Sequence, residues 1–514
     1  MVAAGILLSR IFGLVRQRAF AHYLGNSDAA DAFMAAFRIP NLLQNLFGEG
    51  ALSASFIPVY AGQLGRQDIR EADRTANAVL ALLGLVVAVV VLAGVLAAPL
   101  LVSAIAPGFT GDKRTLTIQL VRILFPGAGL LVVSAWCLGV LNSHRKFFMS
   151  YAAPVVWNVA VILALVVWGG GSRSLTAGPL ATAAAWGSVV GSALQVAVQL
   201  PQVFRLLRRL RPVFSTASAS VQTVIRNFVP AFFSRGVVQI SIFVDELIAT
   251  LLPAGAVAAM AYSQTLAILP VSLFGLSVSA AELPQMSRDA ARGEEVDSQL
   301  RQRLDRGLRQ IAFFVVPSAV AFATLGHVVA GAIYQTGEFT RTDTLYVWGI
   351  LAGSAVGLLA STLGRLYAST YYALKDTRTP LRYAMVRLAG TVGLGFPFAL
   401  LLPGLLGLDP KWGAAGLTVS AGIAGWIEFV LLRRTMNRRI GRTGISAEFQ
   451  ARLWAGAVLA AMAAWAILAL AGARHPILLA LVALIPYGLV YFGVTSMLGV
   501  PEAKALWSRE RPPR

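Results

Sequence analysis

The sequence predicts an all-α polytopic membrane protein with about fourteen transmembrane helices, and three observations lead to this class. Of its 514 residues, 57% are hydrophobic and 13% are charged, with a mean hydropathy of +0.71, whereas soluble domains carry roughly 25% charged residues. Apolar stretches long enough to cross a bilayer recur along the whole chain. The loops between them are alternately rich and poor in lysine and arginine, which is typical of a multi-pass protein.

The spans follow from length, because a transmembrane helix needs about 17–25 predominantly apolar residues. They are predicted at residues 3–23, 29–62, 76–104, 117–142, 150–170, 176–200, 227–252, 256–285, 310–334, 344–373, 383–402, 412–432, 453–473 and 475–498.

The distribution of basic residues orients these spans. The net charge of +20 would indicate a nucleic-acid partner in a soluble protein. Here 30 of the 43 lysines and arginines lie after even-numbered spans, 6 lie after odd-numbered spans and 7 lie inside spans. The positive-inside rule therefore places both termini in the cytoplasm. The positive charge therefore reflects membrane topology and does not predict a nucleic-acid partner. The basic loops are instead expected to contact anionic membrane lipids.

The first two spans carry an unusual number of charges for their apolar surroundings. A charged side chain at a helix centre costs at least about 2.5–3.5 kcal/mol on insertion scales, and such residues usually face a wet cavity. The charged residues of these two spans are Arg10, Arg16, Arg18, Asp31, Arg38 and Glu49. We therefore expect them to line a cavity rather than to face lipid.

The second span predicts both a polar stripe and a bend. At 100° per residue, Asp31, Arg38 and Glu49 lie within about 40° of one another on a helix. Pro40 is expected to kink the span, because proline lacks the backbone N–H and clashes with the preceding turn. The glycines on either side of Glu49 are further expected kink points. Spans three to six are mostly alanine, leucine, valine and glycine, which is typical of packing helices.

The chain then begins a second, similar half. Ser-Arg at 234–235 matches Ser-Arg at 9–10, Pro270 matches Pro40, and Pro284 matches Pro58. Each repeat has six spans, so the two halves are expected to run in the same direction across the membrane. The predicted divisions are an N-lobe at 1–200, a basic cytoplasmic loop at 201–226, a C-lobe at 227–432, a second basic loop at 433–452, two additional spans at 453–498 and a cytoplasmic tail at 499–514.

One polar segment interrupts the second half. Residues 286–309 mix basic and acidic side chains, and they are expected to form a helix on the cytoplasmic surface between spans eight and nine. A solvated connector is the simplest interpretation of such a charge run, and a regulatory role is the alternative.

No enzyme signature is visible in the sequence. It has no phosphate-binding loop, no serine elbow and no metal-binding motif. The single cysteine, Cys137, and four scattered histidines predict neither an intramolecular disulfide nor a metal site. We therefore expect a transporter without a metal or cofactor, driven by a coupling ion, the membrane potential or the substrate gradient.

The arginines point to an anionic substrate. The guanidinium group binds phosphate in a bidentate fashion and stays protonated, so Arg10, Arg16, Arg18 and Arg38 around one cavity suit a diphosphate. Asp31 and Glu49 are then expected to hold these arginines or to act as gates. The alternative is that Arg10 and Arg18 reach to the headgroups from span ends, and that Asp31 and Arg38 form a structural ion pair.

The seventh span adds three candidates from the second half. Arg235 matches Arg10 through the repeat and is a further candidate for substrate binding. Asp245 and Glu246 lie 100° apart on a helix, so one of them is a candidate cation site. The alternative is that these acids pair with Arg235 or Arg365.

Several motifs resemble one known family in order and spacing. They are SRIFGLVR at 9–16, DAFMAAFRIPNLL at 31–43, FGEGALSASFIPVY at 47–60, APGF at 106–109, VLNSHRKF at 140–147, APVVWN at 153–158, GEFT at 337–340 and DTRTP at 376–380. Together they resemble the MurJ/MviN lipid II flippases of the MOP exporter superfamily, over nearly the whole chain.

The resemblance implies fourteen helices, two six-helix lobes and a central V-shaped cavity. It implies transport of the undecaprenyl-diphosphate-linked peptidoglycan precursor from the inner to the outer leaflet of the bacterial cytoplasmic membrane. It also implies cavity roles for Arg10, Arg16, Asp31, Arg38 and Glu49. Cell-wall synthesis enzymes are the protein partners that this function implies.

The chain departs from the family pattern at charged positions. Gln17 stands where the family usually has an acidic residue, Gln44 and Asn45 stand where it has a basic pair, and Thr265 lies where it has an arginine. The alternatives are therefore a flippase for another polyprenyl-linked glycan, a cation or drug antiporter of the same superfamily, and a non-transporting scaffold for cell-wall enzymes.

Overall fold

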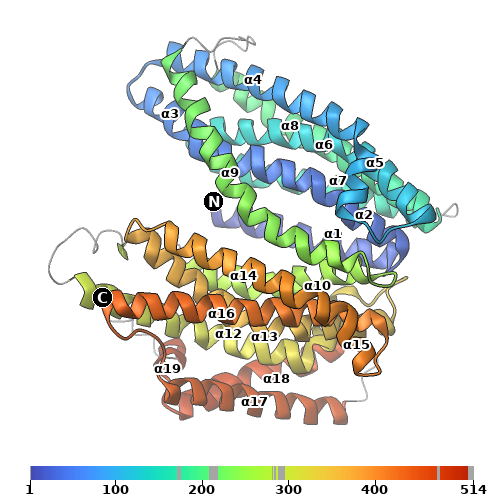
Figure 1. Ribbon diagram of the computed structural model, residues 1–514, viewed down its shortest axis with the longest axis vertical. Coiled ribbons are helices and arrows are strands. Elements are labelled where there is room, and N and C mark those ends of the chain that lie inside the picture. The colour runs from blue at the N-terminus through green and yellow to red at the C-terminus, as the bar shows by residue number, and fades with distance from the viewer. Residues whose placement is uncertain are drawn as a thin grey trace. The chain divides into compact units, whose positions relative to one another are not determined.

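The computed structural model is helical throughout the part of the chain that it describes (Figure 1). The described residues are 2–170, 175–207, 218–279, 282, 285–286, 296–471 and 475–507. Within these ranges, the side chains of residues 2–7, 48–50, 147, 150–151, 231, 233–242, 296 and 505–507 are outside the description. The all-α prediction is confirmed.

Eleven helices of the described chain are long and apolar enough to cross a membrane, and they coincide with predicted spans three to six and eight to fourteen. The other three predicted spans are also helical. They are α1 (Val2–Leu24), the continuous run of α2 (Asp28–Leu43), η1 (Gln44–Leu52) and α3 (Ser53–Gly65), and α9 (Ala219–Ala249). These three runs contain all the charged residues selected above as candidates for the site.

The chain divides into two compact units. Unit 1 comprises residues 1–258 together with 337–339, and unit 2 comprises 259–336 and 340–514. Unit 1 therefore includes α9, the first span of the predicted C-lobe. The predicted lobe boundaries stay a prediction.

Unit 1 is built around α6 (Gly111–Ser143). This helix packs against α2, α4 (Ile69–Leu96) and α8 (Ala177–Leu206), while α1 packs against α7 (Phe147–Gly169). The short α5 (Ala98–Ile105) leads from α4 back to α6. The side chain of Trp136 is completely buried, and its Nε1 donates a hydrogen bond to the carbonyl of Ala76 at 3.2 Å. This buried tryptophan therefore fixes α6 against α4.

The predicted bend in span two is a π-helical segment. η1 begins four residues after Pro40, where the missing N–H and the steric clash of proline are relieved by a wider turn. A second π-helical segment, η2 (Val271–Leu276), directly follows Pro270, which ends α10 (Ala256–Pro270). Because Pro270 was matched to Pro40 by sequence, the shared π-helical turn supports the predicted repeat.

Unit 2 is organised around α13 (Arg341–Ala373), which packs against α12 (Val296–Tyr334) and α16 (Gly413–Ile440). Its α13–α16 contact is backbone to backbone, since a Cβ on Gly357 would lie 2.4 Å from the Cα of Gly422. The remaining elements are α14 (Arg378–Phe396), η3 (Pro397–Leu401), α15 (Leu402–Leu405), η4 (Pro410–Trp412), α17 (Ala447–Leu470), α18 (Pro476–Met497) and α19 (Pro501–Trp507).

The two C-terminal spans, α17 and α18, pack against each other and against α12. Two buried tyrosines of α18 fix this arrangement: the hydroxyl of Tyr487 donates to the carbonyl of Pro317 at 2.7 Å, and that of Tyr491 donates to the carbonyl of Phe313 at 2.6 Å. Burying these hydroxyls with partners fixes the register of α18 along α12.

The expected surface helix at 286–309 differs from the structure. Residues 296–309 are the first turns of the continuous helix α12, because the apolar face at Leu300, Leu304 and Leu308 is already buried there. Residues 287–295 lie outside the described part.

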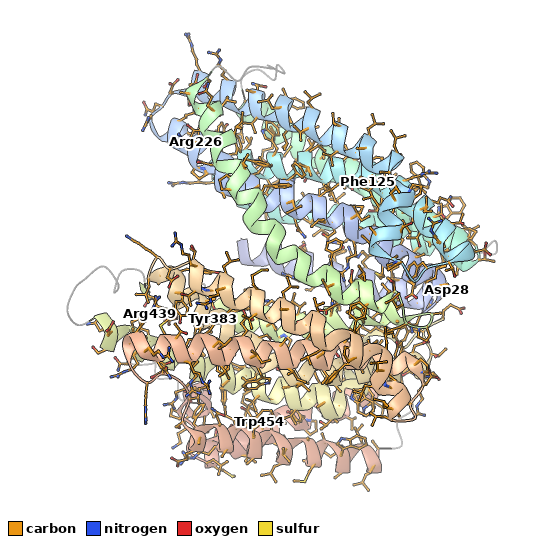
Figure 2. All side chains as sticks on the ribbon, viewed as in Figure 1. Asp28, Phe125, Arg226, Tyr383, Arg439 and Trp454 are labelled. Carbon is orange, nitrogen blue, oxygen red and sulfur yellow. The ribbon has the colours of Figure 1, made fainter. Side chains whose placement is uncertain are left out.

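One end of unit 2 carries a belt of polar contacts between its loops and helices (Figure 2). Arg439 forms an ion pair with Asp376 at 2.6 Å, and the Tyr383 hydroxyl lies 2.6 Å from that of Thr435. These residues belong to the basic loops that the sequence assigns to the cytoplasm.

Candidate functional site

The candidate site is the set of charged side chains on α1, α2 and α9 of unit 1. These are the three helical runs outside the eleven apolar spans counted among the described residues, and they hold the charged residues selected from the sequence. All nine residues selected from the sequence belong to unit 1. The site is therefore described within this unit alone.

Helix α1 presents two arginines that no side chain in the described part of the chain neutralises. Arg10 is exposed and Arg16 is half-buried, and neither forms an ion pair or hydrogen bond within the described part of the chain. They lie 120° apart around the helix axis with a rise of about 9 Å, so both long side chains are able to reach a group placed between them. Arg18 is also half-buried, and it points about 160° away from Arg16 on the helix.

An aromatic ring holds Arg16 in place. Its guanidinium carbon lies 4.7 Å from the ring centroid of Trp157 on α7. Trp157 is itself fixed, because its Nε1 donates to the carbonyl and hydroxyl of Ser188 at 3.1 and 3.2 Å, and its ring stacks on Phe37 at 5.7 Å. A cation–π contact of this kind positions the guanidinium without using its N–H donors.

Arg38 is neutralised by α9. It forms an ion pair with Glu246, and the two side chains are only 20% and 8% exposed. Asp245 also acts electrostatically on Arg38. The sequence left Arg235 and Arg365 as partners for these acids; among the described side chains the structure pairs Glu246 with Arg38, and Arg235 lies outside them. The predicted cation site at Asp245 or Glu246 stays a prediction.

Asp31 is fully buried and holds the start of α10. Its Oδ2 accepts from the backbone N–H of Gly255 at 2.7 Å and its Oδ1 accepts from that of Ala258 at 2.8 Å. The ammonium of Lys113 on α6 donates to the same carboxylate at 2.6 Å and lies 2.8 Å from Asp28. The carboxylate thus caps the first turn of α10 and pairs with Lys113, not with Arg38.

The backbone is closely packed around Asp31. A Cβ on Gly108 would lie 2.0 Å from the carbonyl oxygen of Thr250, so the loop before α6 touches the end of α9 directly. Gly255 has φ +87°, and a Cβ there would meet Asn26 at 2.5 Å. Ser27, the N-cap of α2, lies beside this contact and accepts from the N–H of Ala30 at 3.3 Å. This end of unit 1 is therefore held together mainly by backbone groups.

Two predicted residues fall outside the described side chains, namely Glu49 and Arg235. Sequence analysis missed two residues that the structure brings to the site. Lys113 entered it only as one of the charges after odd-numbered spans, and Trp157 only as part of the motif APVVWN at 153–158. Their signal is weak, since a lysine near a span end and a tryptophan in an apolar helix are both ordinary. No cluster of histidine, cysteine and acidic residues suited to a metal occurs among the described residues.

Comparison with known proteins gives consistent matches. The family model described as lipid II flippase MurJ matches residues 20–487. A probable lipid II flippase MurJ of Rhizobium tropici is 32% identical over 443 residues, covering 85% of this chain and 80% of the relative. The lipid II flippase MurJ of Burkholderia cenocepacia is 31% identical over 447 residues, covering 85% and 83%.

Solved structures match the fold over most of the chain. A lipid II flippase MurJ in an inward closed conformation has a TM-score of 0.79 at 22% identity, covering 97% of this chain and 98% of the other. An inward-facing multidrug transporter of the MATE family in the MOP superfamily has a TM-score of 0.69 at 17% identity, covering 84% and 95%. At these identities the structural matches show the fold alone.

Proposed function

We propose, from the premise that this chain belongs to the lipid II flippase MurJ family, that the arginines of unit 1 bind the diphosphate of lipid II during its transport. Membership follows from a family model that covers residues 20–487 and from relatives that are 31–32% identical over most of the chain. The chain is therefore a multi-pass lipid II flippase, a transporter rather than an enzyme. The roles of individual residues below are our proposal.

The membrane orientation is part of this proposal. Both termini face the cytoplasm of a bacterium, and the loops after odd-numbered spans face outward. The support is the ratio of 30 to 6 lysines and arginines between the two sets of loops. In this orientation α1 starts on the cytoplasmic side, and the Asp31–Lys113 pair lies at the outer end of unit 1.

The observation that carries the proposal is the state of Arg16. Its guanidinium is held by the Trp157 ring at 4.7 Å and has no ion pair or hydrogen bond in the described part of the chain. A half-buried cation without a counter-ion is partly desolvated at a cost, and the diphosphate of an incoming lipid supplies that counter-ion. Arg10, about 1.7 turns earlier on the same helix, binds the second phosphate group.

Arg38 takes a different role from the α1 arginines. In this structure it is paired with Glu246, so a diphosphate has to displace a carboxylate to reach it. This exchange releases a negative charge on α9 and makes Glu246 or Asp245 available to a proton or another cation. We infer that such an exchange couples substrate binding to the ion gradient or membrane potential that drives transport.

Complementation tests the arginine roles. In a bacterium depleted of its own flippase, we expect Arg16→Ala to abolish rescue and Arg16→Lys to restore part of it, because lysine keeps the charge but not the bidentate geometry. Arg66→Ala is the matched control, since Arg66 is an exposed arginine just after α3 and outside the site. Membrane abundance is measured for every variant. Full rescue by Arg16→Ala at normal abundance would refute the proposal that Arg16 binds the diphosphate.

The same experiment separates the alternatives for this chain. A cation or drug antiporter would not rescue growth even as the wild-type protein. A non-transporting scaffold for cell-wall enzymes would still rescue with Arg10 and Arg16 neutralised. A flippase for another polyprenyl-linked glycan would fail to rescue but would bind that lipid with the same arginine dependence.

A further inference from the structure

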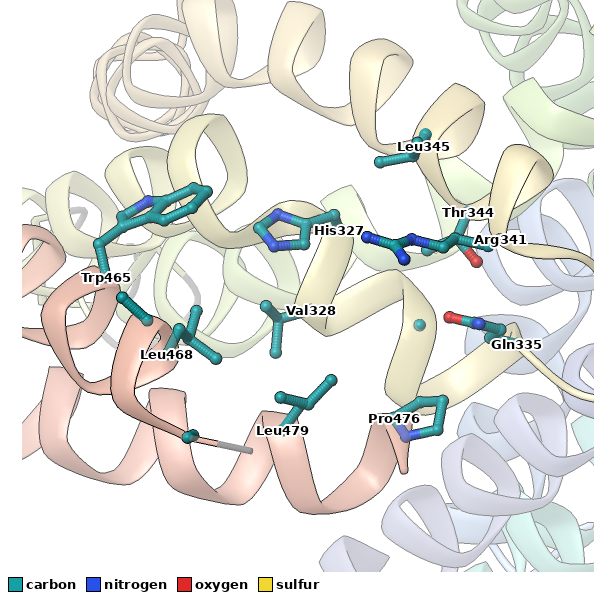
Figure 3. Close-up of a pocket in the computed structure, with 13 residues that line it drawn as sticks. His327, Val328, Gln335, Arg341, Thr344, Leu345, Trp465, Leu468, Pro476 and Leu479 are labelled. Carbon is teal, nitrogen blue, oxygen red and sulfur yellow. The ribbon is translucent and has the colours of Figure 1, made fainter. Parts of the chain in front are cut away.

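A cavity in unit 2 is unrelated to the arginines of unit 1. It has a volume of about 620 Å³ and lies where the end of α12 meets the start of α13, beside the end of α17 and the start of α18 (Figure 3). This volume is in the range of about 300–1,000 Å³ that is common for small-molecule sites. By the orientation proposed above, it opens at the outer side of the membrane.

The polar wall of this cavity is cationic. The guanidinium group of Arg341 extends toward the ring of His327 (Figure 3). Arg341 is exposed and forms no ion pair or hydrogen bond within the described residues. The acid nearest in sequence, Asp343, is already bonded to the backbone and hydroxyl of Thr340 in the cap of α13. The positive charge at this wall is therefore left for a ligand.

His327 adds a second polar group with unused bonding capacity. Its Nδ1 is buried and has no hydrogen-bond partner among the described residues. The ring cannot turn freely, because it packs against Trp348 at 5.0 Å and Trp465 at 5.4 Å between ring centroids. A buried nitrogen without a partner is unfavourable in the absence of a ligand or water.

The opposite wall is apolar. Leu468 and Leu479 line it from α17 and α18, and both pack against the small buried cluster that joins α18 to α12. Leu478 and Leu481 of the same helix α18 are 53% and 51% exposed, as expected for a membrane span that meets lipid. An anion with an attached hydrocarbon chain matches a cavity with one cationic wall and one apolar wall formed by such spans.

We propose that this cavity binds the phosphate headgroup of an outer-leaflet glycerophospholipid. Arg341 contacts the phosphate, the headgroup lies against the His327 ring that lines the cavity, and one acyl chain follows the apolar wall between α17 and α18. Such a lipid fills the contact between the two C-terminal spans and α12. The cavity lies in unit 2 and shares no residue with the proposed transport site, but its assignment to the outer leaflet rests on the membrane orientation given under the proposed function.

Native mass spectrometry of the purified full-length protein tests this inference. Detergent-solubilised protein is titrated with phosphatidylglycerol, and the tightest bound lipid is followed in the wild type, Arg341→Gln and Arg341→Lys. We expect Arg341→Gln to weaken its binding roughly ten-fold or more, as expected for loss of a charge-assisted contact, and Arg341→Lys to retain most of it. Arg114→Gln is the matched control, since Arg114 also lies in the first turn of a helix but belongs to α6 of unit 1.

Two further probes identify the ligand. Diacylglycerol has the chains without the phosphate and should not compete, while glycerol 3-phosphate has the phosphate without the chains and should compete only weakly. Equal binding by wild type and Arg341→Gln would overturn the site. Displacement by glycerol 3-phosphate as effective as by phosphatidylglycerol would assign the cavity to a free phosphate compound, and equal competition by diacylglycerol would exclude phosphate recognition.

Discussion

Replacing Asp31 by asparagine tests how strongly unit 1 depends on one buried carboxylate. Asp31 is fully buried, accepts two backbone hydrogen bonds from the start of α10 and pairs with Lys113 at 2.6 Å. Asparagine has nearly the same shape but no charge and only one acceptor oxygen. One of the two backbone N–H groups therefore loses its partner, and Lys113 keeps only Asp28.

The expected cost follows from these three contacts. Breaking a buried ion pair by removing one partner costs about 3–5 kcal/mol. Lys113 retains a carboxylate at 2.8 Å, so the lower end of that range applies to the pair. The backbone N–H left without an acceptor costs about 1–3 kcal/mol. We therefore expect Asp31→Asn to destabilise the protein by about 4–6 kcal/mol in total.

The neighbouring carboxylate provides the control. Asp28 contacts the same Lys113, but its side chain is 62% exposed, and an exposed pair contributes only about 0–1 kcal/mol. Thermal unfolding of the detergent-solubilised proteins, followed by loss of the monodisperse chromatographic peak, should therefore show a large downward shift for Asp31→Asn and almost none for Asp28→Asn. Equal midpoints for the two variants would refute the capping role of Asp31.

Two further predictions use the same thermal assay. Gly108→Ala should clearly lower the midpoint of thermal unfolding, because its Cβ would lie 2.0 Å from the Thr250 carbonyl oxygen and the backbone has to move. Gly62→Ala is the control: a Cβ at this position of helix α3 has nothing within 4 Å, so the substitution should be neutral or stabilising by about 0.5–1 kcal/mol. Equal losses for the two variants would contradict the close-contact argument. Burial lowers the pKa of His144, just after α6, where its Nε2 lies 3.0 Å from the Tyr60 hydroxyl. The folded state therefore favours the neutral ring. The contribution of His144 to the free energy of unfolding is fully present above the ordinary pKa of about 6.5, and it is lost as the pH falls through the lower pKa of the folded state. His144→Gln should reduce the loss of stability between pH 7 and 5, and an unchanged pH profile would show that this residue does not contribute.

The fold was largely predictable because its physical causes are local. Eleven apolar spans are visible from composition alone, and the charges of the first, second and seventh predicted spans stand out in the sequence. The bend after Pro40 follows from proline chemistry, although the sequence did not specify that it would be a π-helical segment. The first turns of α12 were predicted as a surface helix because their charged face is conspicuous in the sequence. The buried leucines of these turns are spaced about one turn apart among the charged residues, so they do not form an apolar run that the sequence makes obvious.

The partners within the site were not predictable in the same way. An ion pair between Arg38 and Glu246 joins residues more than two hundred positions apart, so it depends on how α9 packs against η1 and α3. Asp31 and Arg38 lie on one stripe of α2, which suggested a direct pair, yet they are seven residues apart and therefore about 10 Å apart along the axis. Each finds a closer partner on another helix, Lys113 for Asp31 and Glu246 for Arg38.

The contrast between Arg16 and Arg38 has a mechanistic consequence. Both are cations on helices of unit 1, but Arg38 pairs with a carboxylate, whereas the partner of Arg16 among the described residues is an aromatic ring. A site in which every arginine was paired would have to break every pair before binding a diphosphate, and a site with none paired would carry the full cost of several buried charges. In the proposed mechanism, an arginine without a counter-ion among the described residues provides initial affinity, and a second that exchanges partners makes the α9 carboxylates responsive to occupancy. We propose that the substrate changes the charge state of α9 when it reaches Arg38, and that this change links binding to the driving force.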